Sequence, residues 1–151
     1  MSCISDVLFL ANNIIRSSRI VLNEKLKPLG LSSAEANILL QLLTVGDMVR
    51  QEDLVEQLDV SKPAVSRALD ALEHKGFVTR ERDLSDKRAC LVTLTPKAHA
   101  AASLLNDTYE QIVRVAEAGL TAEDTAVFLA VFQKVSNNFT LYRTDARKGN
   151  Q

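Results

Sequence analysis

The sequence has little of what disulfide-bonded, metal-binding or membrane-spanning proteins require. Its two cysteines, Cys3 and Cys90, lack metal-ligand spacing, which argues against a disulfide framework and a zinc site. The two histidines, His74 and His99, have no cluster of carboxylates or cysteines around them, so surface or helix-lining positions are expected. No apolar run approaches a membrane span, and the first residues lack a signal peptide's basic and apolar segments. We expect a cytoplasmic protein with no metal and no membrane partner.

Catalytic motifs are also missing. The sequence has no nucleophile motif, no glycine-rich phosphate loop and no paired carboxylates beside a base. These absences argue against an enzyme, and no cofactor is expected.

Net positive charge is absent as well, because the formal net charge is −1, which at first sight argues against a nucleic-acid partner. The distribution of charge differs from its sum. Residues 61–90 hold seven Lys and Arg against five Asp and Glu, whereas the rest of the chain holds eleven against fourteen. Local positive charge matters more than the total for contact with phosphates. The charge therefore permits DNA binding without predicting it.

Length and composition fit one globular domain spanning residues 1–151. A chain of 151 residues is long enough to bury a sizeable core. Hydrophobic residues make up 46% and charged residues 25%, as is typical of soluble globular proteins.

The stretch 61–95 predicts a helix followed by a two-stranded hairpin. Ser61 is a suitable N-cap, Pro63 fits the first turn, and Gly76 ends the helix. One apolar stripe keeps helical spacing and is expected to be buried. It consists of Val65, Ala68, Leu69 and Leu72.

The predicted hairpin carries a basic tip. Two alternating, β-branched runs at residues 77–82 and 90–94 predict its strands. A polar loop at 83–87 joins them, and its descending side carries Lys87 and Arg88. A helix followed by such a hairpin is the sequence form of a winged helix-turn-helix. The stretch is therefore interpreted as a DNA-reading unit.

Further helices flank this unit. The predicted helices are residues 4–26, a second that opens with the capping box Ser32–Glu35, residues 50–58, a long helix capped by Thr95 that runs to Gly119, and a last helix that opens at Thr121–Asp124. The polar tail from Asp145 is expected to be frayed. We predict a mainly α fold with a small β-hairpin wing, an α+β winged helix-turn-helix.

The outer helices present more apolar surface than the small central module can cover. Helices at opposite ends of a chain with matching apolar faces are natural dimer elements. Residues 1–30 and 96–142 are therefore predicted to dimerise, around a DNA-binding region at 31–95, and to match an inverted-repeat site. The candidate dimerisation residues are Val7, Leu8, Ala11, Ile14, Phe128, Phe132, Val135 and Phe139. The alternative is a monomeric bundle that buries these stripes internally.

The wing segment carries a family resemblance. D-L-S-D-K-R-A-C-L-V-T-L-T-P-K-A at 83–98, after L-E-H-K-G-F-V-T-R at 72–80, resembles the wing of the multiple antibiotic resistance regulator (MarR) family. The order of elements is similar too, and the resemblance covers essentially residues 4–142. It implies a homodimeric bacterial transcription regulator, usually a repressor, that is released from DNA when a small-molecule effector binds.

The resemblance also implies roles on DNA. Arg88 would enter the minor groove, where a guanidinium on a thin hairpin suits the narrow, electronegative groove, and Asp86 would hold it with a salt bridge. Arg67 could read guanine by a bidentate bond, unless Asp70, three residues later, pairs with it. The implied DNA-binding residues are Ser61, Lys62, Pro63, Ser66 and Arg67 at the major groove or its phosphates, Arg80 and Arg82 on the backbone, and Asp86, Lys87 and Arg88 at the wing tip.

Three alternatives stay open. A winged helix can serve as a protein-interaction module without DNA, although the basic residues on and beside the hairpin disfavour this. Cys3 could make the protein a thiol-based redox sensor, because one branch of the family senses peroxides through a cysteine on its first helix. Arg16, Ser17 and Arg19 could line an effector pocket, bridge the dimer or simply be solvated, so no effector site is assigned.

Overall fold

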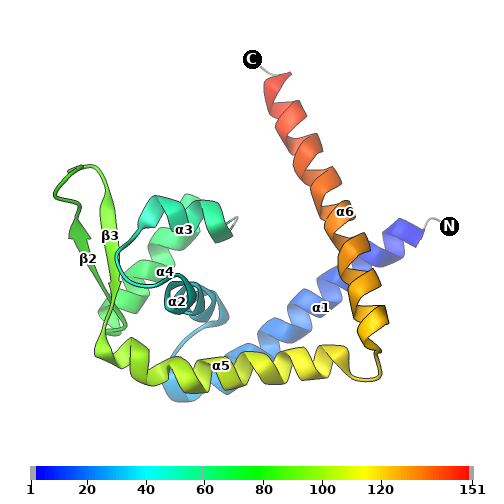
Figure 1. Cartoon of the computed structure of the whole chain (residues 1–151), viewed down its shortest axis with the longest axis horizontal. Coiled ribbons are helices and arrows are strands. Elements are labelled where there is room, and N and C mark those ends of the chain that lie inside the picture. The colour runs from blue at the N-terminus through cyan, green and yellow to red at the C-terminus, as the bar shows by residue number, and fades with distance from the viewer. Residues whose placement is uncertain (1–2, 59, 150–151) are drawn as a thin grey trace. The chain divides into compact units, whose positions relative to one another are not determined.

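The computed structural model describes residues 3–58 and 60–149. They form a mainly helical fold with one small sheet, as predicted (Figure 1). The elements in chain order are α1 (Cys3–Leu26), η1 (Lys27–Leu29), α2 (Ser33–Val45), β1 (Val49–Arg50), α3 (Gln51–Leu58), α4 (Lys62–His74), β2 (Val78–Arg82), β3 (Cys90–Leu94), α5 (Pro96–Glu117) and α6 (Ala122–Lys148). The chain divides into two compact units, residues 1–112 and 113–151.

Local signals in the sequence place the helix ends. The Ser32 hydroxyl accepts from the Glu35 amide at 3.2 Å, and the Glu35 carboxylate accepts from the Ser32 amide, which completes the predicted capping box. Thr121 and Asp124 form the second capping box at the start of α6. Gly76 follows α4 with φ +81°, the left-handed conformation that glycine adopts without strain.

The core of the first unit is formed by residues of α1, α2, α3, α4, the three strands and α5. Its largest fully buried side chains are Leu26, Leu39, Leu42, Leu54, Leu69, Leu72, Phe77 and Leu105. The predicted buried stripe of α4, formed by Val65, Ala68, Leu69 and Leu72, lies entirely in this core. Burial of this stripe leaves the opposite face of α4 in solvent.

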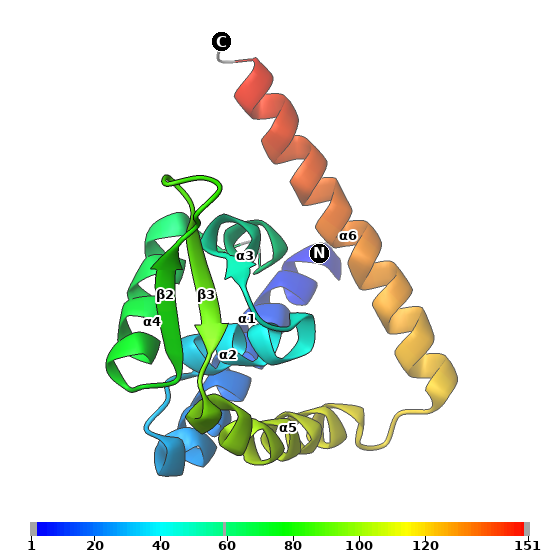
Figure 2. The ribbon, with the colours of Figure 1, turned by 60° about the vertical axis from the view of Figure 1, so that its left-hand side comes forward.

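The sheet has three strands rather than the predicted two. β2 and β3 pair antiparallel as the expected hairpin, with Arg80 opposite Val92. β1 pairs with the other edge of β3, with Val49 also opposite Val92. The predicted third helix accordingly begins at Gln51 instead of residue 50. Figure 2 shows the sheet beside α4, with the hairpin loop beyond the strand ends.

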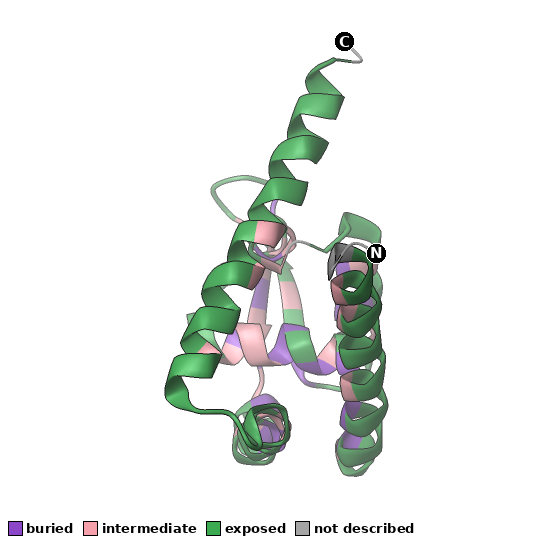
Figure 3. Cartoon of the chain, turned by 90° about the vertical axis from the view of Figure 1, so that its right-hand side faces the viewer, coloured by how far each residue is buried: buried purple, intermediate pink, exposed green. Residues whose placement is uncertain are grey.

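The second unit is dominated by α6, which is longer than predicted. The tail from Asp145 was expected to be frayed, but the helix continues to Lys148. The Gly149 amide donates to the Asp145 carbonyl, and Arg147 and Lys148 place positive charge at the negative end of the helix dipole. Figure 3 shows α6 exposed along most of its length, and none of its described residues is buried.

Candidate nucleic-acid interface

The outward face of α4 carries the polar residues predicted to meet DNA. Lys62, Pro63 and Arg67 are exposed, and Ser66 is half-buried at the edge of the face. Ser61 caps the helix, because its hydroxyl accepts from the Ala64 amide at 3.3 Å. The buried stripe on the other side of α4 fixes this orientation, so the exposed face is presented by a rigid element.

α3 braces α4 from the preceding position in the chain. α3 ends at Leu58 and α4 begins at Lys62, a connection short enough for a helix-turn-helix. Leu54 packs fully into the core. The Gln57 side-chain oxygen accepts from the Gln41 side-chain amide at 3.0 Å, and this hydrogen bond links α3 to α2. The predicted helix-turn-helix is present.

The ion pair with Asp70 that the spacing left open for Arg67 does not form. The Asp70 carboxylate instead accepts from the Arg80 guanidinium, whose second partner is Glu73 at 3.2 Å. Arg67 has no ion pair among the described residues. The reason is that β2 runs beside α4 and brings Arg80 to Asp70, a contact that spacing along the helix does not reveal. Arg67 therefore keeps its charge available to a ligand.

The wing loop is built on Asp83. The Asp83 carboxylate accepts from the Ser85 hydroxyl at 2.7 Å and the Ser85 amide at 2.9 Å. It also forms an ion pair at 2.8 Å with Arg50, which sequence reasoning missed because β1 was not predicted. The Ser85 hydroxyl above all, with the Ser85 amide and Arg50, lowers the pKa of the Asp83 carboxyl. The base of the loop is closed by the Asp83 amide, which donates to the Ala89 carbonyl at 3.0 Å.

The expected salt bridge between Asp86 and Arg88 is also wrong. The Asp86 carboxylate accepts from the backbone amide of Arg88 at 3.0 Å, which is an Asx turn. Arg88 forms no ion pair within the described part of the chain. The turn places the Asp86 carboxylate beside the Arg88 backbone amide, because Asp86 lies two residues before Arg88. Asp86 thus shapes the backbone beneath Arg88 and leaves its guanidinium in solvent.

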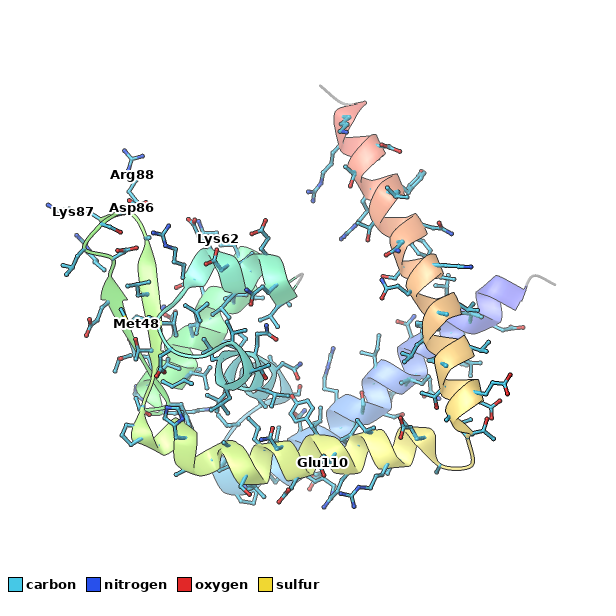
Figure 4. The ribbon with its side chains drawn as sticks, in the orientation of Figure 1. Met48, Lys62, Asp86, Lys87, Arg88 and Glu110 are labelled. Atoms are coloured by element: carbon cyan, nitrogen blue, oxygen red, sulfur yellow. The ribbon has the colours of Figure 1, made fainter. Side chains whose placement is uncertain are left out.

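The start of α4 and the wing tip lie on the same side of the first unit. Figure 4 shows Lys62 and the tip residues Asp86, Lys87 and Arg88 toward one side, and Figure 2 shows the start of α4 and the hairpin loop there as well. Arg82, at the end of β2 that leads into the loop, is exposed. Cations without an ion pair among the described residues occur on both elements: Lys62, Arg67, Arg82, Lys87 and Arg88.

The candidate dimerisation residues lie on apolar surface that each unit leaves open. On α1, Leu8 and Ile14 are exposed while Val7 and Ala11 are half-buried. On α6, Phe128 and Phe139 are exposed, Phe132 and Val135 are half-buried, and the Phe128 and Phe132 rings stack at 4.8 Å. Each unit exposes further apolar side chains: Phe9, Leu10, Ile15 and Ile20 on α1, and Val131, Leu141 and Tyr142 on α6.

The two cysteines and the candidate effector-binding residues lie on α1 and β3. Cys90 is a half-buried free thiol on β3, whereas the Cys3 side chain lies outside the described residues. Arg16, Ser17 and Arg19 are exposed on α1. Across the described residues no group of three His, Cys, Asp or Glu could hold a metal ion. In that same part of the chain, no helix combines the length and apolar character needed to cross a membrane.

Comparisons with known proteins agree with this architecture. A MarR family model matches residues 29–89. The chain is 33% identical over 127 residues to the HTH-type transcriptional regulator YwoH of Bacillus subtilis (strain 168), covering 82% of this chain and 91% of that protein. Among solved structures, it is similar to a cysteine-to-serine mutant of MarR from E. coli complexed with operator DNA (25% identity, 89% of this chain and 99% of that one, TM-score 0.77). It is also similar to a putative MarR family regulator from Listeria monocytogenes complexed with 26mer DNA (23% identity, 100% and 97%, TM-score 0.82).

Proposed function

Because the chain belongs to the MarR family of transcriptional regulators, we propose that it is a homodimeric, sequence-specific DNA-binding repressor. It binds an inverted-repeat operator in the bacterial cytoplasm and is released when a small-molecule effector binds. Members of this family are regulators rather than enzymes. The proposal draws on two relatives of the same fold that were solved with DNA.

The observation that carries the proposal is the shared orientation of α4 and the wing tip. A helix of this width fits the major groove, and a thin hairpin bearing a guanidinium fits the adjacent minor groove. Lys62 and Arg67 on one element and Arg88 on the other keep their charges available. Contacts between such cations and phosphates supply much of the affinity of a protein for DNA. They depend on the local positive charge rather than on the net charge of the chain.

Each predicted residue other than Arg80 then has a role in the complex. Arg67 reads a base edge in the major groove, and guanine suits its bidentate geometry. Arg88 enters the minor groove, and Asp86 holds the turn beneath it. The remaining contacts to phosphates and sugars come from Ser61, Lys62, Pro63, Ser66, Arg82 and Lys87.

Dimerisation is supported by the apolar surface of both units. Phe9 is 73% exposed on α1 and Tyr142 is 75% exposed on α6. Exposed aromatic and aliphatic residues in such number are typical of an interface, because water contact with them is unfavourable. Residues 1–30 and 96–142 form the dimer and residues 31–95 read DNA. Two DNA-binding regions related by a two-fold axis match an inverted repeat whose half-sites lie a whole number of DNA helical turns apart.

Selection of bound DNA from a random duplex pool tests the proposal. The expected result is an enriched inverted repeat, bound with an affinity that falls steeply as salt increases. Enrichment of a single, non-repeated site would contradict the dimer. Absence of any enriched sequence would refute DNA reading and favour a winged helix that contacts proteins.

A further inference from the structure

Arg80 differs from the other cations of the interface in being fully engaged within the protein. Its side chain is only 20% exposed. Its Nη2 atom donates to the Asp70 carboxylate and to Glu73 Oε1, the latter at 3.2 Å. Its backbone amide donates to Glu73 Oε2 at 3.0 Å. One residue of β2 thus makes three hydrogen bonds to two carboxylates on successive turns of α4.

These contacts make Arg80 a poor ligand for a phosphate. Two carboxylates around one guanidinium give the group a net negative charge, which repels the DNA backbone. A phosphate could attract Arg80 only by displacing Asp70 or Glu73 and leaving that carboxylate beside the DNA. The Glu73 hydrogen bond, followed by those of Asp70, also raises the pKa of Arg80 against the opposing effect of its burial. The cation is therefore already stabilised without DNA.

The position of Arg80 explains what its contacts do. Gly76 connects α4 to β2, and the wing tip begins beyond Arg82, at the far end of β2. Arg80 lies between these points, opposite Val92 of the central strand β3. Contacts here join α4 to the middle of the hairpin, so they resist rotation of one against the other about the connection at Gly76.

We propose that Arg80 is a positioning residue that fixes the angle between α4 and the wing through Asp70 and Glu73. This places Arg67 and Arg88 on neighbouring grooves of one DNA site at the same time. The inference replaces the DNA-backbone contact predicted for Arg80, and it rests on the proposed DNA-binding function.

Variants of the two carboxylates separate positioning from phosphate contact. Asp70→Asn with Glu73→Gln removes two negative charges and with them the ion pairs of Arg80. If Arg80 only positions the wing, this variant loses about tenfold of its preference for the selected operator over a scrambled duplex, because relief of charge repulsion strengthens binding to both duplexes alike. If Arg80 binds phosphate, the variant binds both duplexes more tightly and its preference is unchanged. Glu81→Gln is the matched control, because Glu81 is an exposed carboxylate on β2 with no ion pair among the described residues, and its loss should not weaken binding.

The Arg80→Ala variant and the triple variant complete the test. Positioning predicts that Arg80→Ala loses operator affinity but changes affinity for a scrambled duplex by less than about twofold, with an unchanged salt slope. The triple variant should bind no worse than Arg80→Ala, because the same contact is absent in both. Thermal unfolding of each variant shows whether the fold persists at the assay temperature.

The outcomes that overturn the inference are distinct from those that overturn DNA reading. A salt slope reduced by about one in Arg80→Ala, with equal losses on both duplexes, would identify a phosphate contact. Unchanged operator affinity in Arg80→Ala would refute any role in binding. Failure of the unmodified protein to prefer the selected duplex over the scrambled one would instead refute the proposed function.

Discussion

At the scale of single residues, the candidate interface depends on which charged side chains form ion pairs within the protein and which remain unpaired. Asp70 and Glu73 engage Arg80, and Asp83 engages Arg50, so these groups hold the wing in place. Sequence spacing found the charged residues but not their partners. The i, i+3 spacing suggested Arg67 for Asp70, whereas the β2 strand supplies Arg80 from ten residues away. Such pairings depend on tertiary packing and cannot be obtained from helical periodicity.

Arg88 gives the most direct prediction at this scale. Arg88→Ala should weaken operator binding by about 1–3 kcal/mol, because a groove contact by an unpaired guanidinium is lost. Fluorescence anisotropy titration of the selected duplex measures the change. Arg147→Ala, which removes an exposed cation outside the predicted interface, is the control and should bind normally. Equal affinities of Arg88→Ala and the unmodified protein would rule out the minor-groove role.

Tyr109 gives a prediction about pH and stability. Its hydroxyl donates to the Asn37 side-chain oxygen, which joins α5 to α2, and burial raises the pKa of Tyr109 from 10.0 to about 12. The unfolded chain therefore ionises first. The contribution of Tyr109 to stability is complete below pH 10 and is lost as the pH rises through about 12. After allowance for partial solvent exposure, this loss is about 1 kcal/mol in free energy of unfolding.

Urea unfolding measured from pH 9 to about pH 12 tests this expectation. Tyr109→Phe should flatten the decline in stability over this interval. Tyr142→Phe is the matched control, since Tyr142 is the only other tyrosine and is 75% exposed. A decline of the same size in Tyr109→Phe would show that other groups cause it.

At the scale of elements, the helix caps, the short strand β1 and the wing loop determine how the DNA-binding region at residues 31–95 is assembled. The helix starts at Ser32, Ser61 and Thr121 were predictable, because a cap is a local signal. β1 was not, because a two-residue strand has no periodicity and exists only through pairing with β3. The wing loop was placed correctly, yet its Asx turn and its ion pair to β1 required the structure.

The connection at Gly76 gives a prediction for an element boundary. Gly76→Ala should lower the free energy of unfolding by about 1 kcal/mol, because alanine is strained at positive φ. Gly149→Ala is the matched control, since Gly149 ends α6 with φ −76° and should change stability by less than about 0.5 kcal/mol. Thermal or urea unfolding of both variants measures the difference. Equal stabilities would show that residue 76 tolerates a side chain.

At the scale of the whole molecule, the proposed function requires a second copy of the chain. α6 has no buried residue among those described, so a 27-residue helix exposes phenylalanine and leucine side chains in the isolated chain. The sequence predicted a dimer from the excess of apolar surface, and this stays a prediction. The extent of that surface was underestimated, because periodicity marks one stripe and misses apolar residues off it, such as Phe9 and Tyr142.

Phe128→Asp tests the dimer. Phe128 is exposed and stacks on Phe132, and a charge in a buried apolar interface is strongly unfavourable. Light scattering should show the mass of the unmodified protein halved in this variant, and operator binding should weaken with it. Asn138→Asp adds the same charge at an exposed polar position of α6 and should remain dimeric. A monomeric unmodified protein would contradict the predicted assembly.

The most direct measurement is binding of the intact protein to operators with altered half-site spacing. The selected inverted repeat is compared with one whose half-sites are moved apart by about five base pairs, half a helical turn. A dimer with two fixed reading heads should lose most of its preference over scrambled DNA on the altered site, because the second half-site then faces away. Equal affinity for both spacings would contradict the central claim that two copies of this chain read one operator together.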